Sequence, residues 1–133
     1  MWQASSNKSA QAPDTKQVAL VHWQRDYSKA LEFAKQVNKP LLLDFYATWC
    51  GPCQRMEQEV YSRPAAADYI NSHFVPVQID LSDGKPLPIA HKLNVRALPT
   101  LAIQSSDGET VARSVGYRGR SYMMQWLKSH AES

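Results

Sequence analysis

The most constraining feature of the chain is a dithiol motif placed where an apolar run gives way to a helix. The only two cysteines, Cys50 and Cys53, are separated by two residues and follow shortly after the apolar run Leu41–Tyr46. A mostly continuous apolar run of this length is typical of a central strand covered on both faces. Pro52 suits the first turn of a helix, where its missing N–H removes no hydrogen bond. A strand followed by Cys-x-x-Cys and a helix is the arrangement of a dithiol redox site.

The rest of the chain alternates between strand-like and helical patterns. Apolar residues recur at spacings of three and four from Tyr27 to Val37, which predicts a helix that ends before Pro40. Asp107-Gly108 lies between two strand-like runs and predicts a hairpin. This alternation predicts an α/β fold with a central mixed β-sheet flanked by helices on both faces. The expected elements are strands at 18–23, 41–46, 74–79, 101–103 and 110–112, and helices at 26–37, 52–61, 65–72, 89–93 and from Ser121 onward.

Length, composition and charge favour a single domain. The 133 residues are 44% hydrophobic, and their net charge of +3 includes no long basic run. So weak a charge does not indicate nucleic-acid binding. No stretch approaches the roughly 20 apolar residues of a membrane helix. We expect a polar, disordered segment at residues 1–17, a folded domain at 18–133, and a monomer.

The polar N-terminal segment leaves the location of the protein open. It is rich in Ser, Ala, Gln and Asn and lacks the apolar core of an intact signal peptide. It fits a linker that remains after removal of an export signal or membrane anchor, and it fits a disordered cytoplasmic tail equally well. Two cysteines are too few to identify the redox compartment.

The order of the two cysteines predicts their roles. Cys50 would lie at the N-terminus of the helix, where unpaired N–H groups and the helix dipole stabilise a thiolate. Cys50 is therefore the expected attacking residue. Cys53, one turn later and more buried, would resolve the mixed disulfide formed with a substrate. Gly51 leaves the approach to Cys50 open, and Pro52 stiffens the turn.

Two alternatives for the cysteine pair are a static disulfide and a metal half-site. A structural bridge that closes so short a loop would stabilise the fold little. Zinc requires four ligands, and no two of the four histidines are three or four residues apart. The chain also lacks a Gly-x-Gly-x-x-Gly nucleotide fingerprint. We therefore expect neither a metal nor a bound cofactor.

Two segments, one of which contains the dithiol, carry a resemblance to a known family. Asp-Phe-Tyr-Ala-Thr-Trp-Cys-Gly-Pro-Cys, at 44–53, resembles the thioredoxin active-site segment almost residue for residue. Val-Arg-Ala-Leu-Pro-Thr, at 95–100, is similar to the second thioredoxin signature, whose proline is cis and faces the dithiol. Gly116 also matches. The resemblance covers roughly residues 18–131 and implies the thioredoxin fold.

Within this superfamily, other segments resemble the C-terminal domain of the membrane thiol:disulfide interchange protein and related exported proteins. These segments are Asn38–Asp44, Met56-Glu57 and Arg63-Pro64. The resemblance implies an exported or periplasmic location, with a cytoplasmic one as the alternative.

The resemblance also implies roles for individual residues. Asp44 matches a buried acid, whose raised pKa would let it accept the proton of Cys53. Pro99 matches the cis-proline beside which an extended substrate segment would bind, and Leu98 would help to select that substrate. Trp49 would form an apolar wall beside Cys50, although by sequence alone it could equally be a core residue. The substrate-binding set expected from the resemblance is Trp49, Gly51, Pro52, Leu98, Pro99 and Gly116.

Three departures from the thioredoxin pattern affect the expected chemistry. Pro76 stands where thioredoxin has a buried lysine, which leaves Asp44 without that cationic partner. Gln54 replaces a lysine beside the dithiol, and this loss should raise the pKa of Cys50 somewhat. Gln58 replaces a proline, so the active-site helix should lack the usual kink.

The resulting functional prediction is a thiol:disulfide oxidoreductase, specifically a protein-disulfide reductase. Gly-Pro between the cysteines favours reduction by resemblance to thioredoxin. Its partners would be disulfide-containing proteins and an upstream electron donor, either a reductase or a membrane thiol:disulfide interchange protein. The alternatives are a thioredoxin-like binding or chaperone module without turnover, and a disulfide oxidase or isomerase.

Overall fold

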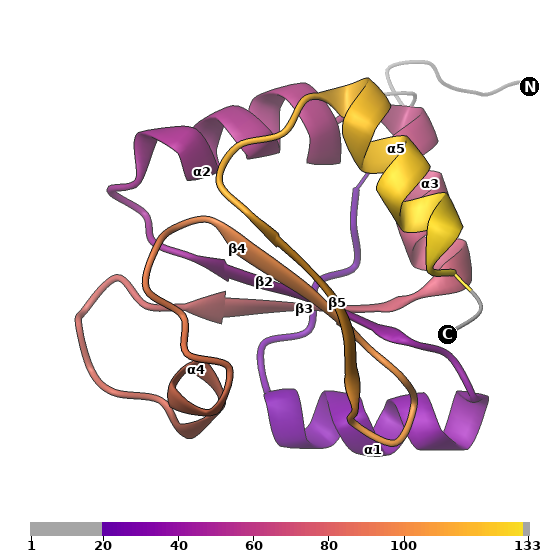
Figure 1. Cartoon of the computed structure of the whole chain (residues 1–133). Helices are drawn as coiled ribbons and strands as arrows, with labels where there is room; N and C mark the ends of the chain where they lie inside the picture. The colour runs from indigo at the N-terminus through magenta and orange to yellow at the C-terminus, as the bar shows by residue number, and fades with distance from the viewer. Residues whose placement is uncertain (1–19, 132–133) are drawn as a thin grey trace, which may run out of the picture.

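The computed structural model describes residues 20–131. These residues form a mixed four-stranded sheet with helices on both faces (Figure 1). The strands are β2 (Leu41–Tyr46), β3 (Val75–Asp80), β4 (Thr100–Gln104) and β5 (Thr110–Val115). The helices are α1 (Tyr27–Val37), α2 (Gly51–Met56), the π-helical η2 (Glu57–Tyr61), α3 (Pro64–His73), α4 (Pro88–Lys92) and α5 (Arg120–Ser129). The predicted α/β class is confirmed.

The order of the strands places β2 inside the sheet. The order is β3-β2-β4-β5, with β2 parallel to β3 and antiparallel to β4. The hairpin of β4 and β5 is antiparallel, as the Asp107-Gly108 turn predicted. In this register Asp44 lies opposite Gln78 on one side and Leu101 on the other. The Asp44 side chain therefore projects from an inner strand of the sheet.

Alternation along β2 sends its side chains to two separate apolar layers. Leu41, Leu43 and Phe45 belong to a cluster with α1, whereas Leu42 belongs to a cluster with α2, η2, α3 and α5. Figure 1 shows α2, α3 and α5 on one side of the sheet and α1 and α4 on the other. Asp44 shares the face of Leu42 by this alternation, so it lies beneath the layer that contains the active-site helix.

Helix boundaries follow local capping chemistry. Asp26 caps α1 by accepting a hydrogen bond from the Lys29 N–H at 3.2 Å, and Asn38 ends the helix with φ of 56°. The last helix, predicted from Ser121 onward, begins one residue earlier, at Arg120. Gly119 is the N-cap of α5 and has extended backbone angles, a conformation and position that glycine accepts well.

The active-site helix is less regular than the sequence predicts. A single helix is expected from residue 52 to 61, but the α-helical part ends at Met56 and Glu57–Tyr61 forms a π-helix. Val60 and Tyr61 are adjacent and both buried, and the wider π turn accommodates this packing. π turns often lie at functional sites. The absence of proline at Gln58 therefore does not make this helix regular.

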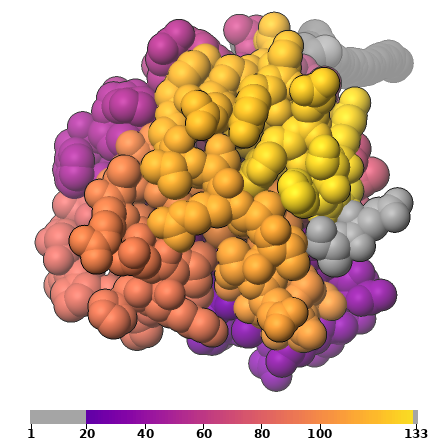
Figure 2. Space-filling view, in the orientation of Figure 1, coloured from indigo at the N-terminus to yellow at the C-terminus, as the bar shows by residue number. Residues whose placement is uncertain are grey.

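The chain before α1 does not form the predicted first strand within the described residues. Leu20–Trp23 has no strand pairing, and Gln24 makes one isolated parallel bridge with Val77. The start of that predicted strand and the predicted polar segment 1–17 lie outside the described residues. No helix in the described part of the chain is long and apolar enough to cross a membrane. Figure 2 shows that β5 and α5 form much of one face of the molecule.

Candidate active site

The dithiol lies at the junction of β2 and α2. Cys50 is the N-cap of α2, and a disulfide joins it to Cys53 with a Cα–Cα distance of 5.2 Å. The Cys53 N–H donates a hydrogen bond to the Cys50 Sγ at 3.1 Å. This N–H belongs to the first turn, where helical donors lack helical partners. The same donor would stabilise a Cys50 thiolate once the disulfide is reduced.

The burial of the two cysteines differs from the prediction. Cys50 is 5% exposed and Cys53 is 8% exposed, so Cys53 is not the more buried residue. Both pack with Ala47 in a small apolar cluster that Leu98 covers. Cys53 also lines a pocket of about 430 Å³ that Asp44 lines too. Cys53 and Asp44 therefore share one pocket.

Trp49 lies at the surface next to Cys50, so it is not a core residue. Its side chain is 67% exposed, and its indole N–H donates to the Ser82 carbonyl at 3.0 Å. Gly51 is exposed, and a Cβ at this position would meet no atom within 4 Å. Both chain neighbours of Cys50 are therefore exposed.

The second predicted signature lies beside the dithiol. Leu98 packs against the cluster that contains both cysteines, and the Leu98–Pro99 peptide bond is cis. The Pro99 carbonyl accepts a hydrogen bond from the Gly116 N–H at 2.8 Å. Gly116 has φ of 90°, which glycine adopts without the strain that a Cβ would cause. Cys50, Leu98, Pro99 and Gly116 are thus linked through contacts between three separate segments.

Asp44 is the buried acid that the sequence predicts. It is 3% exposed, and burial is the main cause that raises its pKa to about 7. The nearby Glu57 carboxylate raises this pKa further, whereas Arg25 lowers it. The Gln78 side-chain amide donates to the Asp44 carboxylate at 3.2 Å and also lowers the pKa. The acid can therefore exchange a proton near neutral pH.

Three residues near Asp44 were missed as site residues in the sequence. Gln78 interrupts an apolar strand, and a polar residue in such a strand was the sequence feature that could have indicated its role in the site. Glu57 follows Cys53 by four residues, a spacing that places both on one helix face. Tyr61 follows Glu57 by another four and is buried. All three line the pocket that Cys53 and Asp44 share.

Two of the departures from the thioredoxin pattern, at Pro76 and Gln54, have local explanations in the structure. Pro76 lies opposite Leu42 in the β2–β3 register, and Gln78 is the residue opposite Asp44. An uncharged amide therefore contacts the acid at this place in the sheet. The Gln54 side chain donates to the Thr48 carbonyl at 2.8 Å, which ties α2 to the loop before Cys50.

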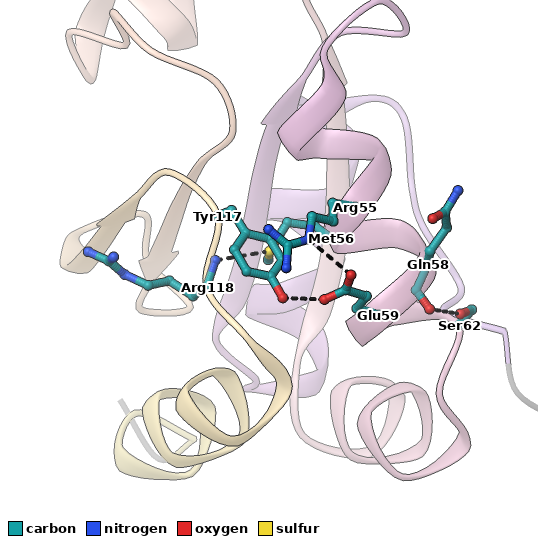
Figure 3. Close-up of polar contacts among 7 residues, drawn as sticks. All are labelled: Arg55, Met56, Gln58, Glu59, Ser62, Tyr117 and Arg118. Atoms are coloured by element: carbon teal, nitrogen blue, oxygen red, sulfur yellow. Dashed lines mark hydrogen bonds and ion pairs between the residues drawn. The ribbon is translucent and has the colours of Figure 1, made fainter.

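A polar network holds the chain after Gly116 against the active-site helix (Figure 3). Arg55 forms an ion pair with Glu59 at 3.0 Å, and its guanidinium lies 4.1 Å from the centre of the Tyr117 ring. The Tyr117 hydroxyl donates to Glu59. The Arg118 N–H contacts the Met56 Sδ at 3.4 Å. These contacts fix the segment that follows Gly116, and no sequence motif indicated them.

The strand order, the disulfide at a helix N-terminus and the adjacent cis-proline segment together define a thioredoxin-like fold and site. Residues 27–131 match a family described as thioredoxin-like domain. The chain therefore belongs to the thioredoxin-like family.

Individual relatives agree with this assignment. The thiol:disulfide interchange protein DsbD of Vibrio vulnificus (strain YJ016) is 30% identical over 120 residues, which cover 87% of this chain and 20% of that protein. The chain thus spans about a fifth of the length of this relative.

Solved structures show the same fold. The reduced C-terminal domain of DsbD from Neisseria meningitidis has a TM-score of 0.68 at 23% identity, covering 77% of this chain and 92% of that one. A thioredoxin from Thermus thermophilus has a TM-score of 0.71 at 24% identity, covering 84% and 86%.

Proposed function

We propose that this protein is a thiol:disulfide oxidoreductase that reduces disulfide bonds in other proteins. The observation that carries the proposal is the Cys50–Cys53 disulfide at the N-terminus of α2, beside the cis Leu98–Pro99 bond. The similarity to a thiol:disulfide interchange protein supports this activity. Gly51-Pro52 between the cysteines supports reduction as its direction, through the resemblance to thioredoxin.

The proposed reaction transfers two electrons from the reduced dithiol to a substrate disulfide. The Cys50 thiolate attacks one substrate sulfur, the substrate S–S bond breaks, and the other substrate sulfur leaves as a thiolate. Cys53 then attacks the Cys50 Sγ in the mixed disulfide and passes its proton to Asp44. The substrate sulfur that was bonded to Cys50 leaves as a thiolate, and the Cys50–Cys53 bond forms. The pocket that Cys53 and Asp44 both line supports this proton transfer.

The surface around Cys50 is proposed to bind an extended substrate segment. Trp49 offers an exposed apolar ring, and Leu98 packs next to the cysteines. Backbone groups near Pro99 would pair with the substrate, and Leu98 would help to select it. Gly51, Pro52 and Gly116 would leave room for that segment to approach.

An upstream donor must return electrons to the oxidised pair. We propose a reductase or a membrane thiol:disulfide interchange protein for this role, together with an exported or periplasmic location. The match to DsbD supports both proposals. Fractionation of cells that express the full-length chain tests the location, and recovery in the cytoplasm would contradict it.

Single cysteine substitutions test the mechanism. We predict that Cys53→Ser accumulates a mixed disulfide with a protein substrate, because the resolving thiol is absent. Cys50→Ser should form none and should lose turnover. Non-reducing gel electrophoresis with mass spectrometry identifies the trapped bond. If Cys53→Ser traps nothing and substrate binding survives both substitutions, the protein is a binding module rather than an enzyme.

A further inference from the structure

Tyr61 has a buried hydroxyl that the proposed reaction does not yet use. The residue is 3% exposed, and its Oη has no hydrogen-bond partner among residues 20–131. The ring packs edge-on against Trp23 with 5.1 Å between the ring centres. A buried polar group without a partner is costly, so such groups generally bond to protein or to ordered water. The fixed ring therefore holds a hydroxyl that needs a partner.

Tyr61 is one of the residues that line the pocket shared by Cys53 and Asp44, and this pocket has the size and polarity to hold water. Its volume is about 430 Å³, and a water molecule occupies about 30 Å³ in the liquid. A buried water usually has two to four polar partners. Tyr61, Asp44, Glu57 and Gln78 all line this pocket, and Asp44 already accepts one hydrogen bond from Gln78. The carboxylate of Asp44 retains capacity to accept another.

We propose that Tyr61 is a positioning residue, whose hydroxyl donates a hydrogen bond to a water in this pocket that in turn donates to the Asp44 carboxylate. This arrangement rests on the proposed function, because it assigns the path by which Asp44 releases the proton taken from Cys53. In that step Cys53 gives its proton to Asp44 as it attacks Cys50. Asp44 then returns the proton to the pocket water, which exchanges with solvent. Tyr61 supplies orientation and neither gains nor loses a proton overall.

The charges around Asp44 determine the direction of the effect. Burial and the Asp44 and Glu57 charges hold the pKa of Tyr61 well above its ordinary value, so its hydroxyl stays neutral and can donate. A donated hydrogen bond favours the charged form of a carboxyl group. The proposed hydrogen bond from Tyr61 therefore lowers the pKa of Asp44, as Gln78 and Arg25 do. Burial and the Glu57 charge act in the opposite direction and raise this pKa. The titratable or charged groups that line the pocket with Asp44 are Arg25, Tyr46, Cys53, Glu57 and Tyr61.

Tyr61→Phe isolates the hydroxyl, because it retains the ring that packs against Trp23. The titration of Asp44 is followed by NMR of ¹³C-labelled aspartate carboxyl groups in the disulfide form, where neither cysteine titrates. Asp44→Asn assigns the signal. We expect the midpoint to rise by about 0.5–1 pH unit in Tyr61→Phe, since a hydrogen bond to the charged form is lost. An unchanged or lowered midpoint would overturn the proposal.

Ser114→Ala is the matched control. The Ser114 Oγ is also buried without a partner in the described part of the chain, but Ser114 does not line this pocket. We expect the Asp44 midpoint to stay unchanged in this variant. An equal shift in both variants would show a general effect of hydroxyl removal and would contradict the specific role of Tyr61.

Kinetics separate the failure of this inference from the failure of the proposed function. Resolution of a mixed disulfide should slow about 3- to 10-fold at about pH 6 in Tyr61→Phe and approach the unsubstituted rate at about pH 9, as expected for a 0.5–1 unit shift. Normal activity with an unchanged pH profile would overturn the role of Tyr61 alone. An unsubstituted protein without any disulfide-reducing activity would overturn the function, while the NMR titration would still test the hydrogen bond.

A measurement on the unsubstituted protein avoids dependence on any variant. A long-lived water in the pocket should give nuclear Overhauser contacts with the Tyr61 ring protons. Absence of such contacts would contradict the bridging water, even if the phenylalanine variant failed to fold.

Discussion

Asp44 places an ionisable side chain inside a strand that is otherwise apolar. Its pKa of about 7 in the folded protein lies above the ordinary 3.8, mainly because of burial. The folded protein therefore binds more protons than the unfolded chain between these two values. The free energy of unfolding should fall as the pH rises from about 4 to about 7 and stay level above that range.

Replacement of Asp44 by asparagine tests this relation between charge and stability. We predict that Asp44→Asn increases the free energy of unfolding at about pH 8 by up to about 4 kcal/mol and changes it little near pH 4. The asparagine oxygen can still accept the Gln78 hydrogen bond. Urea unfolding at both pH values measures the effect, with Asp68→Asn on the exposed side of α3 as control. Equal effects of Asp44→Asn at the two pH values would contradict the raised pKa.

At the same scale, the sequence predicts the residues that belong to a motif and misses those that only the fold brings together. Cys50, Cys53 and Asp44 lie within one segment and were predicted. Gln78 reaches the site through strand pairing, and that contact depends on a register that the sequence does not specify. Tyr61 reaches it through the π turn, whose wider spacing has no clear sequence signal.

At the scale of elements, α2 and η2 connect the dithiol to both the core and the segment after Gly116. Met56 is central to this connection, since its side chain is 1% exposed in the core cluster and its Sδ accepts the Arg118 N–H. The polar contacts of Arg55, Glu59 and Tyr117 lie on the solvent side of the same helix. Core packing and a surface network thus hold one helix from opposite sides.

Truncation of Met56 tests the contribution of core packing. Met56→Ala should lower the free energy of unfolding by about 2–5 kcal/mol, because it leaves a cavity in a buried cluster. Met56→Leu is the matched variant, which retains apolar volume and should cost less than about 1.5 kcal/mol. Denaturant unfolding compares the two. Similar losses in both variants would indicate that the sulfur contact with Arg118, rather than packing, is the main contribution.

Elements with a strong local pattern were the predictable ones. The apolar run of β2 and the stripe of α1 identified their elements to within a residue. The Asp107-Gly108 turn identified the hairpin, although β5 continues three residues beyond the predicted 110–112. The failures occurred where tertiary context decides. Leu20–Trp23 has strand-like residues but no strand pairing, and α5 starts before the serine that sequence rules favour as a cap.

At the scale of the whole molecule, alternation of strands and helices was enough to predict a mixed sheet with two covered faces. It did not predict the order β3-β2-β4-β5, in which β2 and β4 are the inner strands. This order brings the Pro99–Gly116 contact next to the dithiol at the end of β2. The proposed substrate surface is therefore a property of the complete fold and of no single segment.

The reduction potential of the Cys50–Cys53 pair, measured by equilibration against defined thiol buffers, tests the central proposal most directly. A reductase should have a two-electron potential near the roughly −270 mV of thioredoxin. A potential near the roughly −120 mV of a strong disulfide donor would contradict the proposed direction of transfer. If no two-electron couple is detected, the cysteine pair is not redox-active and the proposed function is wrong.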